Sequence, residues 1–197
     1  RKMKEVRWVK EIVAPAIEEG LKRSEYNLSV RAGYKLTYAY EIKSYKGTSP
    51  HHTESMEYET DLLIVEICEQ DKWIPRVVVE TKKNGQVTTH DAITYSHKAM
   101  SHRQVHPYLR YGILLGENKH YGLPGRLVRH GTQFDFMISW AKEEPTDYEL
   151  NNFIEMLLKE VEASKKLEEI IYKSRKKSRG IYTMLHKELK AVPEEKE

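Results

Sequence analysis

Residues 77–82 read Val-Val-Val-Glu-Thr-Lys, and together with residues 61–65, Asp-Leu-Leu-Ile-Val, they decide the fold. Both runs are short, apolar and rich in branched side chains, which is typical of buried strands. The polar segment 69–72 lies between them and is short enough to join them as an antiparallel hairpin. Counting back from the middle of that segment places Asp61 beside Glu80.

Side chains alternate across a strand, so Glu80 and Lys82 point to one face and Thr81 to the other. With Asp61 alongside, two carboxylates and one amine could hold a hard divalent cation and position a water, as phosphodiester hydrolysis requires. The alternative is a structural Glu80–Lys82 ion pair, because 32% of the residues are charged and other Glu-x-Lys triplets occur, as at 41–43. The catalytic reading is favoured because this triplet follows an apolar strand and an earlier strand headed by aspartate.

In these strand contexts, Asp61 and the triplet at residues 80–82 resemble the PD-(D/E)xK nuclease superfamily, which includes most type II restriction endonucleases. The family pattern is an acidic residue at a strand start, followed by (D/E)-x-K on the neighbouring strand of a hairpin. The chain departs from it in one respect, because Thr60 rather than proline precedes Asp61. The resemblance extends over about residues 5–117.

The resemblance implies an α/β fold with a restriction-endonuclease-like core, in which helices flank a mixed β-sheet. Residues 1–145 would form this nuclease core. Residues 146–197 would form a helical C-terminal extension, either within the same domain or as a dimerisation or DNA-contact element. A length of 197 residues suits one domain with a substantial core.

The resemblance also implies roles for the site residues. Asp61 and Glu80 would ligate Mg²⁺, with Mn²⁺ as a substitute, and the Thr81 backbone carbonyl would supply a further oxygen. Lys82 would orient the attacking water and offset the charge that develops, so that Asp61, Glu80 and Lys82 form the catalytic set. An acidic residue on the first helix often assists metal binding in this family, and Glu18 is the candidate. Glu11, one heptad before Glu18 and so on nearly the same face, is the other candidate on this helix, and Glu59 is a weaker candidate.

Hydrophobic periodicity and turn signals predict the remaining elements. Thr146 and Glu149 are spaced as a capping box for a long helix. The other expected segments are a helix over 5–23 that Pro15 kinks or divides, an extended run over 28–44, a loop over 47–55, a helix over 88–106, a parallel strand over 111–116, and one or two strands within 123–140.

The net charge of +3 points only weakly to a polyanion, but basic residues concentrate near the C-terminus at 173–179. Alone, this cluster is equally well explained as a solvated helix face; beside a nuclease site it favours a DNA-contacting surface. The residues predicted to approach DNA are Lys83, Asn84, His90, Lys98, His102, Arg103, Lys173, Arg175, Lys176 and Lys177.

The composition excludes several classes of protein. No run of eighteen apolar residues exists, so no membrane span is expected, and the first residues lack the apolar region of a secretory signal. Cys68 is the single cysteine, which excludes an internal disulfide framework and suits the cytoplasm. His102 and His106 are spaced as i, i+4, but no recognised zinc motif surrounds them.

The function expected is therefore a Mg²⁺-dependent DNA endonuclease, foremost a type II restriction enzyme. Cutting both strands of a palindrome requires two active sites related by a two-fold axis, so the expected partners are double-stranded DNA and a second copy of the chain. Two alternatives stay open. One is a repair or recombination nuclease, or the nuclease domain of a larger restriction subunit; the other is a non-catalytic DNA-binding protein with the same fold.

Overall fold

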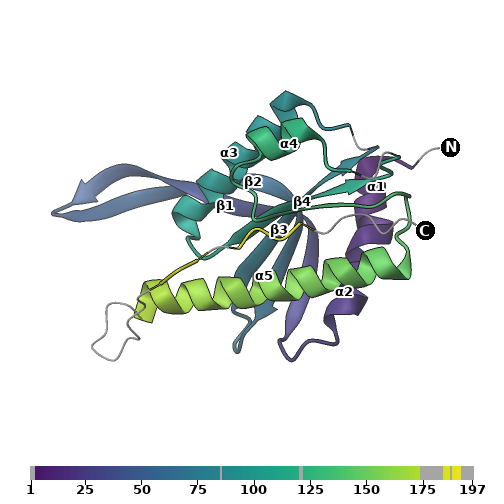
Figure 1. Cartoon of the computed structure of the whole chain (residues 1–197). Coiled ribbons are helices and arrows are strands. Elements are labelled where there is room, and N and C mark those ends of the chain that lie inside the picture. The colour runs from purple at the N-terminus through teal and green to yellow at the C-terminus, as the bar shows by residue number, and fades with distance from the viewer. Residues whose placement is uncertain (1–2, 85, 120–121, 174–183, 187, 192–197) are drawn as a thin grey trace.

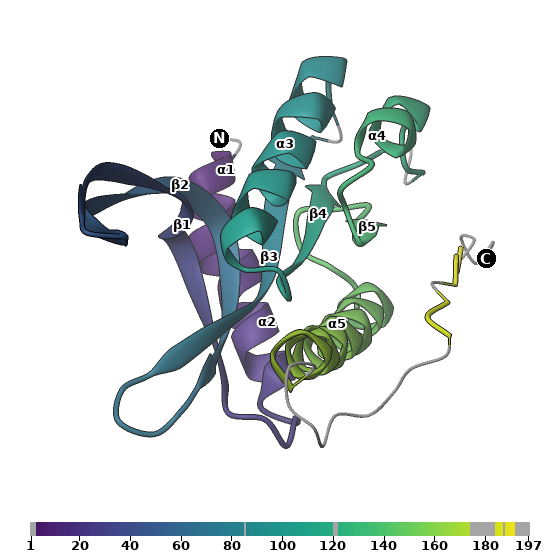
Figure 2. The same ribbon diagram turned by 90° about the vertical axis from the view of Figure 1, so that its left-hand side faces the viewer.

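The two apolar runs lie in neighbouring strands of one mixed sheet. Within the described residues this sheet has five strands in the order β1-β2-β3-β4-β5, and helices cover both of its faces (Figures 1 and 2). The chain therefore has an α/β fold. The computed structural model describes residues 3–84, 86–119, 122–173, 184–186 and 188–191.

The strands are β1 (Leu28–Lys46), β2 (Ser49–Ile67), β3 (Trp73–Lys83), β4 (Arg110–Gly116) and β5 (Phe136–Ser139). The helices are α1 (Glu5–Trp8), α2 (Ala14–Leu21), α3 (Thr89–Val105), α4 (Gly125–His130) and α5 (Asp147–Lys173). A π-helical turn, η1 (Val9–Val13), joins α1 to α2, so the predicted helix over 5–23 is confirmed. Pro15 lies in the first turn of α2, where its missing N–H is tolerated.

Strands β2 and β3 form the predicted antiparallel hairpin. Their register pairs Leu62 with Val79 and Leu63 with Val78. The connection turns at Gln70 and Asp71, which both have positive φ angles of about 60°, as tight hairpin turns of this kind require. The apolar pattern and the short polar connection were sufficient to fix this pairing.

Helix α3 carries the chain from β3 to β4, and β4 lies parallel to β3 as predicted. The helix begins with a capping box: the Asp91 N–H donates to Thr88 Oγ1 at 3.0 Å, and the Thr88 N–H donates to Asp91 Oδ2 at 2.9 Å. These bonds satisfy backbone donors that would otherwise have no partner in the first turn. They also set where the helix starts relative to the end of β3.

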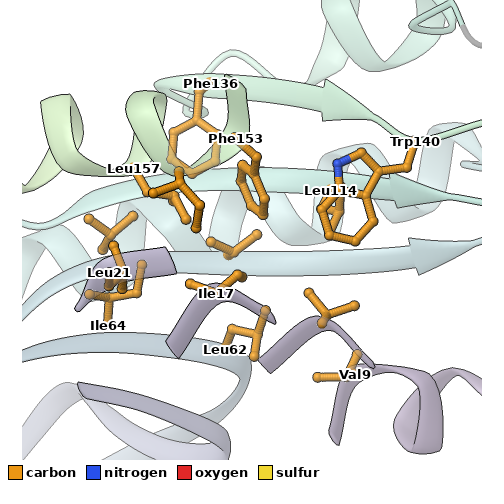
Figure 3. Packing of buried hydrophobic residues seen from close by; sticks show 14 of the residues in the cluster. Val9, Ile17, Leu21, Leu62, Ile64, Leu114, Phe136, Trp140, Phe153 and Leu157 are labelled. Carbon is orange, nitrogen blue, oxygen red and sulfur yellow. The ribbon is translucent and has the colours of Figure 1, made fainter. Parts of the chain in front are cut away.

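The main hydrophobic core lies between one face of the sheet and helices α1, α2 and α5 (Figures 2 and 3). Trp8 packs edge to face against Trp140, and Trp140 packs in the same way against Phe153. Leu62 and Leu114 reach this core from the sheet and are fully buried. Burial of a large apolar side chain stabilises a fold by about 1.5–3 kcal/mol, so this cluster anchors the sheet.

Helices α3 and α4 cover the opposite face of the sheet (Figure 2). Ala99 of α3 packs there against Leu63 and Val78, while Ala92 packs with Leu127 of α4. Because Val78 lies on this face, alternation brings Glu80 and Lys82 to the same side, under α3. The face that carries the predicted catalytic triplet is thus the α3 face.

The outer halves of β1 and β2 form a two-stranded arm that projects beyond the rest of the sheet (Figure 1). The loop predicted over 47–55 is therefore wrong, because β2 begins at Ser49 and pairs with β1 up to Lys46. These residues lack an apolar alternation, but pairing with β1 extends them. Pro50 is tolerated because it stands at the start of the strand, and Gly47 adopts the positive φ of the turn.

The segment 123–140 holds helix α4 followed by one strand, β5, where the sequence predicts one or two strands. Six residues are too few for a clear helical period, which explains why α4 was missed.

Helix α5 begins with the predicted capping box: Glu149 N donates to Thr146 Oγ1 at 3.2 Å, and Thr146 N donates to Glu149 Oε2 at 2.7 Å. It packs into the main core through Phe153, Leu157 and Val161. Charged residues interrupt its sequence throughout. Among the described residues, no helix is both long and apolar enough to cross a bilayer.

Candidate active site

Strands β2 and β3 separate at Asp61, and this fork forms the candidate site. The pairing of β2 with β3 reaches Leu62 and Val79, whereas β3 continues beside β4 as far as Lys83. Past the fork, the Thr81 N–H donates to Asp61 Oδ2 at 2.7 Å, and the Thr81 hydroxyl donates to the same oxygen at 2.9 Å. The Asp61 carboxylate thus accepts the Thr81 N–H at a position where β3 is no longer paired with β2.

The next N–H on this side of β3 is satisfied in the same way. The Lys83 N–H donates at 2.6 Å to Oε2 of Glu5, which belongs to the first helix. Two carboxylates, Asp61 and Glu5, therefore stand side by side along the free edge of β3. Strand geometry places such alternate positions about 6.6–6.8 Å apart.

Glu80 projects from β3 under α3 and is 1% exposed. Its Oε1 accepts a hydrogen bond from the Tyr111 hydroxyl at 2.6 Å and contacts Lys98 Nζ at 2.8 Å. Burial raises the pKa of Glu80 above the ordinary value, and the nearby charge of Asp61 raises it further, against the opposing effects of Lys98 and Tyr111. The two predicted metal ligands are thus close enough to repel each other.

Tyr95 of α3 lies close enough to the carboxylates at the fork for their negative charge to affect its pKa. Burial raises its pKa, and the carboxylates of Asp61, Glu80, Glu5 and Asp91 raise it further. A concentration of carboxylates on the side of one helix is the electrostatic condition under which a site attracts a cation.

Two lysines face this group of carboxylates, and they have different partners. Lys82 Nζ lies 3.2 Å from Asp91 Oδ1 in the cap of α3. Lys98 Nζ contacts Glu80 and also donates to the Glu59 backbone carbonyl at 2.8 Å. The ammonium in direct contact with Glu80 is therefore that of Lys98, which the sequence assigned to DNA contact, and not that of Lys82.

Burial and hydrogen bonding have opposite effects on the pKa of the Asp91 carboxylate. Burial alone would raise its pKa, but hydrogen bonds from Thr88 and from Lys82 bring that pKa below the ordinary value. Asp91 is thus ionised at neutral pH and holds Lys82 at the start of α3.

The oxygen atoms at the fork fit a hard cation. The hydrogen bonds and the ion pair described above use Asp61 Oδ2 and Glu80 Oε1, so Asp61 Oδ1 and Glu80 Oε2 are the oxygens that could face a cation. The Thr81 N–H faces the fork, and a residue's carbonyl points to the same side of a strand as its N–H. Two carboxylate oxygens and one carbonyl oxygen are ligands that Mg²⁺ accepts. Within the described part of the chain, no three His, Cys, Asp or Glu side chains form a metal-binding group.

The acidic candidates on the first helix are placed differently from the expectation. Glu18 accepts a hydrogen bond from the Val30 N–H of β1 at 2.6 Å, and β1 is separated from β3 by β2. Glu11 pairs with Arg7 on the surface at 2.7 Å. Glu5 is the helical carboxylate that the structure brings to the fork. Sequence spacing could not select it, because the choice depends on which end of the helix meets the end of β3.

Glu59, the weaker candidate on β2, contributes to the site through its backbone. Its carbonyl holds Lys98, as described above. Thr60, which precedes Asp61, is fully buried and donates its hydroxyl to the Tyr34 carbonyl at 2.8 Å. This bond holds β1 and β2 together immediately before the fork, so threonine has a structural role at that position.

Besides Lys98, three of the residues predicted to contact DNA have their donors occupied within the fold. Lys83 is 4% exposed, donates to the Met3 carbonyl at 2.7 Å and pairs with Glu143. His102 is fully buried, and its Nε2 lies 3.1 Å from the Leu36 carbonyl. Arg103 donates to the carbonyls of Leu109 and Gln133 and pairs with Asp135. Their expected DNA contacts do not match these placements, because the fold uses their donors.

The remaining predicted contacts divide into two groups. Asn84 and His90 are exposed beside the end of β3 and the start of α3, on the side of the fork. Lys173 is the last residue of α5, and its side chain lies outside the described residues. The basic residues Arg175, Lys176 and Lys177 also lie outside the described residues.

Tyr111 and Tyr95 are site residues that the sequence interpretation missed. Tyr111 pairs in register with Val78, which is two residues before Glu80 and so on the same face. The parallel register between β3 and β4 would have identified Tyr111, but the sequence fixes only that the two strands are parallel.

No protein-family model matches the chain, and no curated protein sequence matches it. A function for the chain is therefore inferred from the residues at the fork.

Proposed function

We propose that the chain is a Mg²⁺-dependent DNA endonuclease whose fold is the restriction-endonuclease-like variety of the α/β class. The observation that carries this proposal is the fork itself, where Asp61 and Glu80 converge from two adjacent strands beside the Lys98 ammonium. Double-stranded DNA is the proposed substrate. A type II restriction enzyme acting as a homodimer is the preferred form, because two sites can then cut both strands.

The residues at the fork would have different roles in binding the cation and in hydrolysis. Asp61 Oδ1, Glu80 Oε2 and the Thr81 carbonyl would hold the cation, and Thr81 fixes the orientation of Asp61 through two hydrogen bonds. When bound, Mg²⁺ supplies neutralisation of phosphate charge and a more acidic water. Lys98 favours the ionised form of Glu80. The partly exposed Lys82 ammonium would position the attacking water or a phosphate oxygen.

A non-catalytic DNA-binding protein with the same fold is the second candidate function. One observation favours it: Glu80 pairs with Lys98 and Asp91 pairs with Lys82, so each of these carboxylates has a cationic partner within the fold. In that case the charges at the fork would be structural. Calorimetric titration with Mn²⁺ separates the two functions, since only the nuclease requires a cation at Asp61 and Glu80.

The decisive experiment incubates purified protein and supercoiled plasmid with Mg²⁺ or Mn²⁺. We expect nicking and linearisation by the wild type, loss of at least a hundredfold in rate for Asp61→Asn and Glu80→Gln, and a wild-type rate for Glu11→Gln, whose surface pair with Arg7 is remote from the fork. Discrete fragments would support a restriction enzyme, whereas smeared or branch-dependent products would favour a repair or recombination nuclease. Absence of cleavage with both metals, together with no Mn²⁺ binding, would end the nuclease proposal.

A further inference from the structure

The distal arm, residues 40–57 of the β1–β2 ribbon, has no core of its own. Every side chain in it is exposed except that of Ser44, which is half-buried. Its strands pair with each other alone among the described residues, and Tyr40 and Tyr45 are 60% and 63% exposed. A two-stranded ribbon without a covering layer is at best marginally stable in water. Such an element gains order when a partner covers it.

The tip of the distal arm, residues 42–53, has the composition of an anion-binding surface. It contains no aspartate or glutamate. Glu41 and Glu54 border the tip and lie opposite each other in the ribbon. Glu54 pairs with Lys43, while Lys46 is exposed and makes no ion pair within the described residues. Nine of its twelve residues have side chains that can donate hydrogen bonds, namely Lys43, Ser44, Tyr45, Lys46, Thr48, Ser49, His51, His52 and Thr53. Phosphates and the base edges of the major groove offer acceptors to such donors.

The distance between the arm and the fork would also allow one DNA duplex to contact both. Strand β2 runs without interruption from the tip at Ser49 to Asp61, and this path is at most about 40 Å long at about 3.3 Å per residue. One turn of duplex DNA measures about 34–36 Å, and its major groove, about 12 Å wide, admits a two-stranded ribbon. A duplex held at Asp61 would therefore pass within reach of the tip about one turn away.

We propose that the distal arm contacts duplex DNA by placing its tip in the major groove, about one helical turn from the phosphate held at the fork. The proposal deepens the proposed nuclease function and rests on it for the location of the scissile phosphate. A second copy of the chain is the competing occupant, because Tyr40, Ile42 and Met56 are exposed apolar side chains on the arm. The absence of carboxylates from the tip favours DNA.

The test uses the full-length chain carrying Asp61→Asn, so that bound DNA is not cut. A labelled mixed-sequence duplex of about three helical turns is titrated over a salt series and followed by fluorescence anisotropy. One variant replaces residues 43–52 by an Asn-Gly turn, which closes the ribbon at the paired residues Ile42 and Thr53. A second carries Lys46→Ala, and the matched control is Lys72→Ala in the exposed β2–β3 turn. Thermal unfolding and gel filtration of each variant verify folding and oligomeric state.

We expect the tip replacement to weaken binding at least tenfold while unfolding at a similar temperature. Lys46→Ala should lower the slope of log affinity against log salt by about 0.9, the contribution of one phosphate contact. Lys72→Ala should leave both affinity and slope unchanged. Unchanged affinity in the tip replacement would overturn the proposal, and so would a loss of dimer with no change in affinity, which would make the arm a clasp between copies.

The two proposals fail in different ways. Metal-dependent cleavage by the wild-type chain together with tip-independent DNA binding would overturn the arm proposal alone. Tip-dependent DNA binding without cleavage would overturn the nuclease alone. If the chain does not bind the duplex at any salt concentration tested, the arm proposal is overturned whatever the outcome with plasmid.

Discussion

Lys98 of α3 and Glu80 of β3 form an ion pair in which Nζ lies 2.8 Å from Oε1, and the glutamate is almost fully buried. The lysine of the triplet, Lys82, lies on the same face but pairs with Asp91. The helix that covers the sheet thus supplies the charge that the sequence motif assigned to the strand. Substitutions at the two lysines should consequently have different effects.

The first prediction concerns Lys98→Met. Removing the ammonium should raise the pKa of Glu80 further, so that less of the carboxylate is ionised at neutral pH. We expect Mn²⁺ affinity at pH 7 to fall about tenfold, as is common when a group that supports a metal ligand is lost, and to recover at higher pH. Calorimetric titrations between pH 6 and pH 9 measure this. Lys82→Met is the control and should leave the pH midpoint of Mn²⁺ binding where it is; equal midpoints for all three proteins would argue against the role of Lys98.

The second prediction concerns the stability of Glu80→Gln. Because burial raises the pKa of Glu80, the folded chain binds this proton more tightly than the unfolded chain. The associated stability is fully present below the ordinary glutamate pKa and is lost as the pH rises through the raised value. Glutamine resembles the protonated form and does not titrate. We therefore expect Glu80→Gln to unfold at a urea concentration equal to or higher than that of the wild type at pH 8. A large loss of stability at pH 8 would contradict this.

The third prediction concerns His102, whose pKa burial lowers to about 4. The unfolded chain binds this proton more readily, so the contribution of the neutral ring is present above the ordinary histidine pKa and is lost as the pH falls toward 4. The shift amounts to at most on the order of 3 kcal/mol. Glutamine can still donate to the Leu36 carbonyl, so His102→Gln should weaken the acid sensitivity of the free energy of unfolding. Urea titrations at pH 7, 6 and 5 test this, with the exposed His90→Gln as the matched substitution on the same helix. An unchanged slope would show that His102 is solvated.

The fourth prediction tests the packing of the first helix against the sheet. A Cβ on Gly116 of β4 would lie 2.2 Å from Cη2 of Trp8, so Gly116→Ala must displace the indole. Overpacking of this kind costs about 1–3 kcal/mol. A Cβ on Gly125 would meet nothing within 4 Å, and Gly125→Ala should be neutral or slightly stabilising. Thermal unfolding compares the two; equal melting temperatures would mean that Trp8 is not seated over β4.

The hairpin could be predicted because its information is local. The apolar runs, their lengths and the polar connection determine the antiparallel pairing, and the pairing brings Asp61 and Glu80 together. The partners of Glu80 could not be predicted in the same way. Tyr111 is placed by the register of parallel strands and Lys98 by the rotation of α3 about its axis, and both depend on packing between distant segments.

The errors have physical causes as well. Residues 47–55 read as a loop because their side chains are polar, but a strand that is exposed on both faces needs no apolar alternation. Glu18 and Glu11 were chosen on the first helix by helical spacing, whereas Glu5 reaches the site because the helix begins beside the end of β3. The sequence predicts that His102 contacts DNA, yet the ring nitrogens of His102 and His106 lie beside backbone carbonyls of β1.

Glu18, which does not lie at the fork, covers the exposed edge of strand β1. Glu18 accepts the Val30 N–H, which points away from β2 along the outer border of the sheet. An unpaired border of this kind invites a foreign strand and, with it, growth of intermolecular sheet. A negative side chain that already occupies the donor discourages that pairing, so loss of Glu18 should show itself as aggregation when the protein is concentrated.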